Sequence, residues 1–229
     1  MEAELLSTYK SLYTRPSEII KLLKMEKNID EFSSPYFKGL LESFITAIYY
    51  NNHEYHKMLK HAYKELTYAN ETKEIERIIN SKIHIGIAYQ NLNMQDSAYI
   101  NYKYFKKYEH LLDSTILSVA YHNMAVLLKN IHATDKNDII TALKKSLKYN
   151  INRDDSARTY MQIAQFYYMT NQIYAADSFI NIFYRCVRKN DFGSYYNISL
   201  IPQHYYKIFF LSTWATKSCS GFCHVRGFT

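Results

Sequence analysis

The chain has 229 residues, a formal net charge of +7 and a sequence pI near 9.0. It contains only 5 Gly and 3 Pro, which leaves little material for tight β-turns, whereas its abundant Lys, Leu, Ile, Ala and Glu suit helices. Three Cys are too few for a disulfide framework, and the positive charge is compatible with an anionic partner without identifying one.

Residues 1–35 are expected to form a helical cap before the main domain. Four apolar residues share one side of a helix over residues 1–12: Leu5, Leu6, Tyr9 and Leu12. Pro16 fits the first turn of a second helix, and Ser34 followed by Pro35 is typical of the start of a third.

Neither a secretion signal nor a membrane span is predicted. The first residues lack a basic stretch followed by an apolar one, and there is no run of about 18 uncharged apolar residues. We therefore expect a cytoplasmic chain, or a periplasmic one if a leader or membrane helix is missing from this sequence.

A small residue and, three positions later, a large apolar or aromatic residue recur together at a constant interval of 39 residues. The small residues are Ala47, Gly86, Ala125 and Ala164, and their partners are Tyr50, Tyr89, Leu128 and Tyr167. Asn52, Asn91 and Asn130 repeat at the same interval and are predicted to end the first helix of each unit. Asn tolerates the left-handed conformation of a helix C-cap, and the alternative role is an amide ladder that holds a peptide backbone.

The second copy of this pattern reads as two amphipathic helices joined by a short polar turn. Gly86 and Tyr89 share a face of the first helix, while Ala98, Tyr102 and Phe105 share a face of the second. We place Gly86 where the two backbones come closest. Leu at this position should overpack the contact, whereas Ala is expected to be tolerated because it occupies the same place in the other copies.

This order of small and aromatic residues resembles the tetratricopeptide repeat, a helix-turn-helix unit that stacks into a solenoid. The resemblance covers residues 36–189, and the longer period, compared with about 34 residues in that family, implies longer helices or loops. The implied fold is all-α: an α-α superhelix of antiparallel helix pairs. We expect a cap over 1–35, a repeat domain of about four units and a half over 36–211, and an irregular tail over 212–229. The expectation is that the natural protein continues beyond this tail, or that the tail is not the original C-terminus.

Residues 96–114, DSAYINYKYFKKYEHLLDS, look like repeats in regulatory proteins of Bacteroidetes, where such segments are sensor or assembly domains. Peptide-pheromone receptors of Firmicutes use similar repeats, although their N-terminal DNA-binding domain has no counterpart in the first 35 residues. The groove positions that the resemblance implies are mostly apolar, with amides and one cation at the rim: Phe44, Ile83, Ile87, Asn91, His122, Val126, Lys129, Asn130, Met161 and Gln165. This lining suits an extended or helical peptide better than a phosphate backbone.

The expected function is therefore a non-catalytic scaffold or sensor module that binds a protein or peptide, with its partner and oligomeric state left open. The alternative is a nucleic-acid-associated transcriptional regulator that uses the lysines of the second helices. Those lysines include Lys57, Lys60, Lys64, Lys103, Lys106, Lys107, Lys144, Lys145 and Lys148. A solvated outer face would explain the same residues.

No enzyme, cofactor or metal is expected. The chain has no glycine-rich phosphate loop and no nucleophile elbow. His53 and His56 flank Glu54 at a spacing of i, i+3, whereas the zinc-protease helix requires i, i+4, so a surface histidine cluster is predicted. Cys219, Cys223 and His224 make only a weak zinc motif, and Cys186 lies in an apolar stretch typical of a buried thiol: IFYRCV.

Overall fold

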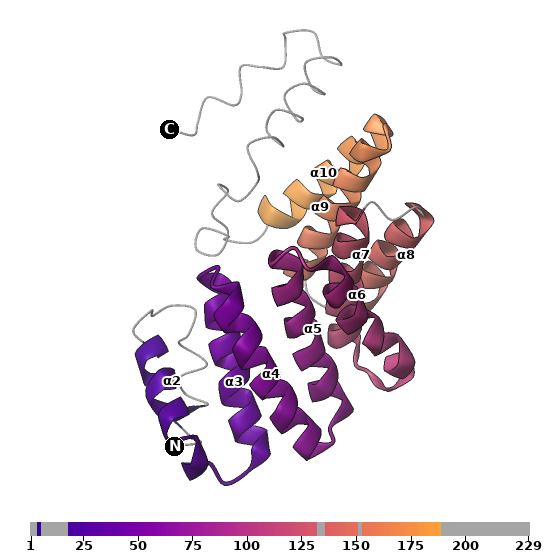
Figure 1. The fold of residues 1–229 in the computed structure, drawn as a ribbon. Helices are drawn as coiled ribbons and strands as arrows, with labels where there is room; N and C mark the ends of the chain where they lie inside the picture. The colour runs from indigo at the N-terminus through magenta and orange to yellow at the C-terminus, as the bar shows by residue number, and fades with distance from the viewer. Residues whose placement is uncertain (1–3, 6–17, 132–135, 151–152, 189–229) are drawn as a thin grey trace, which may run out of the picture. The chain divides into compact units, whose positions relative to one another are not determined.

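A computed structural model of the chain describes residues 4–5, 18–131, 136–150 and 153–188 (Figure 1). All elements in these residues are helical, nine α-helices and two 3-10 helices, which confirms the all-α fold class. The expected helix over residues 1–12, apart from Glu4 and Leu5, lies outside the described residues. So do the half-unit after residue 189 and the tail with Cys219, Cys223 and His224.

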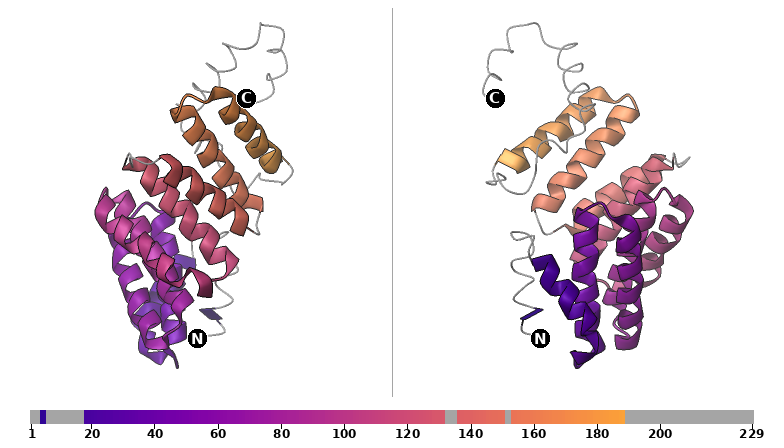
Figure 2. Two further views of the ribbon diagram at one scale, coloured as in Figure 1. Left: turned by 90° about the vertical axis from the view of Figure 1, so that its right-hand side faces the viewer. Right: turned by 60° about the vertical axis from the view of Figure 1, so that its left-hand side comes forward.

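The chain divides into two compact units, Met1–Asn152 and Arg153–Thr229. In the first unit, α2 (Glu18–Lys27) and a 3-10 helix, η1 (Ile29–Glu31), precede three helix pairs. The pairs are α3 (Pro35–Asn51) with α4 (Tyr55–Thr72), α5 (Ile75–Asn91) with α6 (Gln95–Lys103), and α7 (Ser114–Asn130) with α8 (Lys136–Tyr149). A second 3-10 helix, η2 (Tyr104–Leu111), continues α6. In the second unit α9 (Arg153–Met169) pairs with α10 (Ile173–Arg188) (Figure 2).

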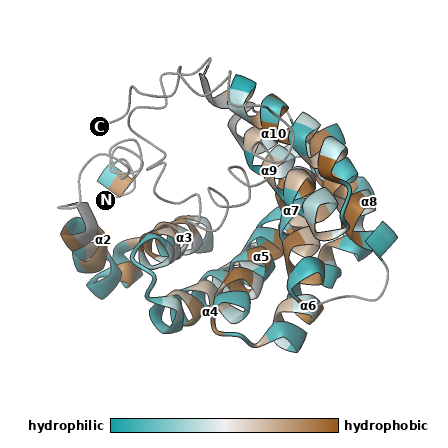
Figure 3. Cartoon of the chain, turned by 90° about the horizontal axis from the view of Figure 1, so that it is seen from above, coloured by the Kyte–Doolittle hydropathy of each residue, from teal (hydrophilic) through white to brown (hydrophobic). Residues whose placement is uncertain are grey.

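Successive helices of the first unit pack against one another in chain order, from α2 through α8. In addition, α5 contacts both α3 and α7, so the first helices of the three pairs form one row. Figure 3 shows this row on the inner side of the first unit, with α4, α6 and α8 on its outer side. Stacked antiparallel helix pairs of this kind make an α-α solenoid, as the sequence predicted.

The first helices have a constant length, and their spacing changes once. Each of α3, α5, α7 and α9 has 17 residues. They begin at Pro35, Ile75, Ser114 and Arg153, which makes the intervals 40, 39 and 39 residues. The interval of 39 is therefore confirmed from α5 onward and is wrong by one residue before it. The extra residue lies in the stretch 55–74, which is one residue longer than its counterpart 95–113.

The turn between paired helices has the same hydrogen bonds in three of the units. His53, Asn93 and Asn171 adopt positive φ values of 59° to 60°. The amide of the next residue then bonds back to a tyrosine carbonyl five residues earlier: Glu54 to Tyr49 at 2.9 Å, Met94 to Tyr89 at 2.9 Å and Gln172 to Tyr167 at 2.8 Å. This is the Schellman motif, which satisfies carbonyl groups at a helix end.

The turn geometry corrects the predicted helix ends in the first unit. Helices α5 and α7 end at Asn91 and Asn130 as predicted, but α3 ends at Asn51 and not at Asn52. Asn52 has a φ of −86°, so it is not the left-handed residue of its turn. In α3 and α5 that conformation falls two residues after the last helical residue, on His53 and Asn93.

The same shift corrects the small residue of the first repeat. Tyr49, and not Tyr50, occupies the position of Tyr89 in the turn. Three residues earlier, Thr46 therefore takes the place of Gly86, and Thr46 is fully buried whereas Ala47 is half-buried. The predicted recurrence of a small residue holds for Gly86, Ala125 and Ala164, all of which are buried.

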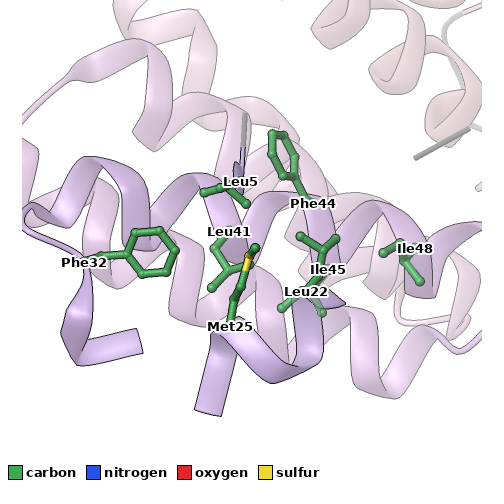
Figure 4. Close-up of a cluster of buried hydrophobic side chains, with 8 residues drawn as sticks. All are labelled: Leu5, Leu22, Met25, Phe32, Leu41, Phe44, Ile45 and Ile48. Atoms are coloured by element: carbon green, nitrogen blue, oxygen red, sulfur yellow. The ribbon is translucent and has the colours of Figure 1, made fainter. Parts of the chain in front are cut away.

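A hydrophobic cluster anchors α2 to α3 at the start of the solenoid (Figure 4). Leu22 and Met25 of α2 pack there with Phe32, which follows η1, and with Leu5. Helix α3 contributes Leu41, Phe44, Ile45 and Ile48. Full burial of one such side chain contributes about 1.5–3 kcal/mol relative to leaving it exposed. The predicted role of residues 1–35 as a cap stays a prediction.

Gly86 lies where α5 meets α6, and the contact is tighter than expected. A Cβ added to Gly86 would stand 2.4 Å from Cε1 of Tyr102. Tyr102 is 1% exposed, and its hydroxyl donates a hydrogen bond to Gln90 at 3.0 Å. The ring therefore has little room to move, which corrects the expectation that Ala would be tolerated here.

We predict that Gly86→Ala lowers the free energy of unfolding by about 1–3 kcal/mol, because the methyl group overpacks the Tyr102 ring. Chemical denaturation of the two proteins measures the difference. Gly86→Ala/Tyr102→Leu is the control, because the smaller side chain removes the obstacle and the double variant should lose less than the two single changes combined. A stabilisation by Gly86→Ala, which helix propensity alone favours by about 1 kcal/mol, would contradict this packing.

Candidate functional site

The side of α5 that turns away from the second helices is the candidate binding surface. Tyr89 of α5 shares a hydrogen bond with Tyr63 of α4 at 2.8 Å, and Lys82 lies over the Tyr104 ring of η2. Ile87 and Asn91 are each two residues from Tyr89, and about 100° of rotation per residue places them nearly opposite to it. They therefore lie on the side of α5 that the second helices do not cover.

Equivalent positions on α3 and α7 extend this surface along the first unit. We use the name inner face for nine residues that share three register positions on these helices: Ser43, Ala47, Asn51, Ile83, Ile87, Asn91, His122, Val126 and Asn130. Ala47, Ile87 and Val126 are half-buried, and the three asparagines are exposed. The surface thus has an apolar middle row with an edge of amides.

The side-chain amide of Asn91 is partly used within its own helix. The side-chain nitrogen of Asn91 donates a hydrogen bond to the carbonyl of Ile87 at 2.8 Å. This bond leaves the side-chain oxygen of Asn91 as the acceptor that faces outward. A ladder of such oxygens could accept hydrogen bonds from the backbone amides of an extended peptide.

Two predicted groove residues are buried inside the chain. Phe44 is 7% exposed and belongs to the cluster between α2 and α3 (Figure 4), and Ser43 occupies its expected place on the inner face. The prediction that Phe44 lines the groove relied on a repeat interval of 39 residues. The interval between α3 and α5 is 40 residues. Ile83 has the predicted register, but its side chain is only 3% exposed. It is therefore buried beneath the inner face.

The remaining predicted residues lie on α7 and α9. His122 is half-buried, and so is Lys129, whose burial lowers its pKa to about 8. Met161 and Gln165 are half-buried on α9 of the second unit, at register positions that match His122 and Val126. Partner binding by any of these residues stays a prediction.

Three further residues share the inner face and were missed in the sequence. Leu40, Asn80 and Val119 stand three residues before Ser43, Ile83 and His122, which places them one turn earlier on the same side of each helix. Leu40 and Asn80 are half-buried and Val119 is exposed. The repeat interval would have found all three once the first interval was set to 40.

Two buried carboxylate–imidazole pairs connect successive helices. Glu42 of α3 contacts His61 of α4 at 2.7 Å, and Glu65 of α4 contacts His84 of α5 at 2.8 Å. Both glutamates and His61 are buried, and His84 is half-buried. The two pairs have the same sequence separation of 19 residues. This spacing is the signal in the sequence that could have indicated them.

The His84 pair makes the stability of the first unit depend on pH. Burial by itself would lower the pKa of His84, but the charge of Glu65 and its hydrogen bond raise the pKa above the ordinary value. His84 is therefore protonated more readily in the folded chain than in the unfolded chain. The protonated pair links α4 to α5 with a charge-assisted hydrogen bond.

The lysines of the second helices form the alternative site, and many of them already have partners. Lys57, Lys64 and Lys145 make ion pairs with glutamates. Lys103, Lys107 and Lys148 lie over tyrosine rings at 5.3 to 5.7 Å. The ion pairs balance part of the positive charge within the chain, whereas the lysines over tyrosine rings keep their charge.

The histidines of the near-motif His53, Glu54 and His56 lie on the surface. His53 and His56 are exposed, as a surface cluster requires. Cys186 is half-buried on α10, so the expected buried thiol keeps some contact with solvent. Within the described ranges, each helix is too short or too polar to cross a bilayer.

No protein-family model and no curated protein sequence matches the chain. Two solved structures have a similar fold. BtubC (BKLC) from P. vanneervenii matches with a TM-score of 0.56 and 15% identity, over 82% of this chain and 91% of that one. The apo form of the quorum sensor NprR from B. thuringiensis matches with a TM-score of 0.52 and 13% identity, over 96% of this chain and 71% of that one. At these identities the likeness shows a shared helical repeat-like fold.

We predict that stability falls as pH rises through the raised pKa of His84. Because the folded-state pKa lies above the ordinary value of about 6.5, the contribution of the pair is fully present below about pH 6.5 and is lost progressively as the pH rises through the raised pKa. Urea denaturation at about pH 6 and about pH 7.5 should show a decrease that His84→Gln reduces by about 0.5–1.5 kcal/mol. The same pH dependence in both proteins would contradict the role of His84.

Proposed function

We propose that the chain is a non-catalytic interaction module of the tetratricopeptide-repeat type that binds a protein or peptide segment along the inner face. The observation that supports this function is the surface itself, three equally long helices that present apolar residues beside exposed amides at matched positions. Apolar anchors would supply most of the affinity, and amide oxygens would align the backbone of the partner.

A sensor role within a regulatory protein is the specific form that we propose. One of the two structurally similar proteins is a quorum sensor, which is consistent with this role. A short segment that lies across α3, α5 and α7 would contact all three helices at once. Its binding would favour one relative arrangement of the helix pairs, and this is how a repeat module can transmit a signal. No catalytic step is included in the proposal.

The amide edge predicts an extended partner with a free backbone edge. Backbone amides of such a segment can donate to Asn51, Asn91 and Asn130, while alternate side chains enter the apolar row of Ala47, Ile87 and Val126.

We predict that a peptide selected from a displayed random library binds the inner face. His122→Glu and Asn91→Ala should each weaken binding about tenfold, which corresponds to about 1.4 kcal/mol, with little change in melting temperature. Fluorescence anisotropy with the labelled peptide measures the dissociation constants. Lys106→Glu/Lys107→Glu is the matched control, since both lysines are exposed on η2 and away from the inner face.

The same variants separate the proposal from nucleic-acid binding. A labelled DNA duplex should bind the parent chain weakly, whereas a nucleic-acid regulator would bind it with an affinity that falls steeply between about 50 and about 200 mM salt. If the lysine variant loses its ligand and the inner-face variants keep theirs, the basic outer surface is the site. Peptides that bind all the variants equally well would also reject the inner face.

A further inference from the structure

We propose that Glu26, Glu42 and His61 form a binding site for a divalent transition-metal ion such as Zn²⁺. Their ligand atoms, one from each residue, all lie within 4.8 Å of one another. The residues come from three helices, α2, α3 and α4, so the site is absent from any local sequence motif. Two carboxylates and an imidazole are ligands that Zn²⁺ and Mn²⁺ accept.

The buried charges of this cluster are incompletely balanced. Glu42 is 0% exposed and His61 is 6% exposed, and Glu26 is half-buried beside them. Lys64 supplies one positive charge through its ion pair with Oε1 of Glu26 at 2.5 Å. With a neutral imidazole, two carboxylates face one ammonium group. Either a proton on His61 or a bound cation would balance the second carboxylate.

One oxygen of Glu42 favours a bound cation over a proton on His61 as the group that balances the second carboxylate. Its Oε2 contacts Nδ1 of His61 at 2.7 Å, so a proton on His61 serves that oxygen. The other oxygen, Oε1, is buried without a hydrogen-bond partner, and Nζ of Lys64 stands 3.6 Å from it. A buried acceptor without a hydrogen bond is unfavourable, and a metal ion bound by both oxygens of Glu42 would give Oε1 a partner.

The distances are close to those that a metal ion requires. For bonds of about 2.0–2.1 Å in tetrahedral geometry, neighbouring ligand atoms stand about 3.3 Å apart. Nδ1 of His61 and Oε1 of Glu26 are 3.6 Å apart. The contact between His61 and Oε2 of Glu42 must lengthen by about 0.6 Å, which a small rotation of the glutamate provides. The Tyr49 ring stacks on His61 at 5.2 Å and restrains the orientation of the imidazole.

Lys64 competes with the metal ion for the two carboxylates. Its side chain is 39% exposed, so the ammonium group can move into solvent when the ion binds. Removal of Lys64 should therefore increase the affinity of the site for the metal ion. A cluster that serves only as a salt bridge would show no such increase. Bound metal would join α2 to the first helix pair and strengthen the start of the solenoid.

Isothermal titration calorimetry of the full chain with Zn²⁺, after treatment with EDTA, tests the site. Cys219→Ser/Cys223→Ser is the parent background, because free thiols bind Zn²⁺ on their own. We expect one site in this parent, with binding about tenfold or more weaker in Glu26→Gln, Glu42→Gln and His61→Ala. His56→Ala is the matched control, since it removes an exposed imidazole of the same helix and should leave the affinity unchanged.

Two further measurements keep the result decisive. Lys64→Met should bind Zn²⁺ more tightly than the parent, and bound Zn²⁺ should slow amide hydrogen exchange in α2 and α4. Circular dichroism of the metal-free variants checks their folding, and Glu26→Gln, which alters the most exposed ligand, provides the test if Glu42→Gln does not fold. A parent that binds no Zn²⁺, or Glu26→Gln and Lys64→Met variants with the affinity of the parent, would overturn the proposal.

Discussion

Each first helix of the first unit depends on cover from the helices that precede and follow it in the chain. An isolated helix of 17 residues is marginal in water, so α5 gains its stability from packing. On one side Gly86 admits the Tyr102 ring of α6, and on another Tyr89 shares a hydrogen bond with Tyr63 of α4. Once these two sides are covered, the third side has no second helix to pack against. The inner face is therefore the surface that remains when the stacking contacts are satisfied.

The sequence predicted the fold because the stacking contacts require small and aromatic residues at a repeated interval. Gly86, Ala125 and Ala164 have the predicted burial, and α5 and α7 end at the predicted asparagines. The first repeat was misaligned by one residue, because the stretch 55–74 holds one residue more than 95–113. One residue corresponds to about 100° of rotation on a helix, which is enough to move Phe44 from the inner face into the core.

The polar contacts between helices could not be predicted in the same way. The contact of Glu42 with His61 depends on how far α3 and α4 are shifted relative to one another along their axes. The apolar pattern of the sequence does not determine this shift. The equal separation of 19 residues in the two carboxylate–imidazole pairs becomes meaningful only after the helices are paired. By contrast, Ile87, Asn91, Val126 and Asn130 were placed by register alone. In the structure the two asparagines are exposed, and Ile87 and Val126 are half-buried. Their predicted role in binding depends on a partner that the register cannot identify.

The two layers of the first unit differ in how much their lengths vary. The first helices have 17 residues each, whereas α4, α6 and α8 have 18, 9 and 14, and η2 contains a non-helical residue, Tyr108. The variation in helix length among these pairs is thus found in the outer layer. The inner layer repeats helices of one length at nearly equal sequence intervals. A bound segment displaced by one helix would therefore meet the same backbone geometry with different side chains. Selectivity between positions along the inner face would then come from residues that differ and reach the surface, such as Ser43 and His122.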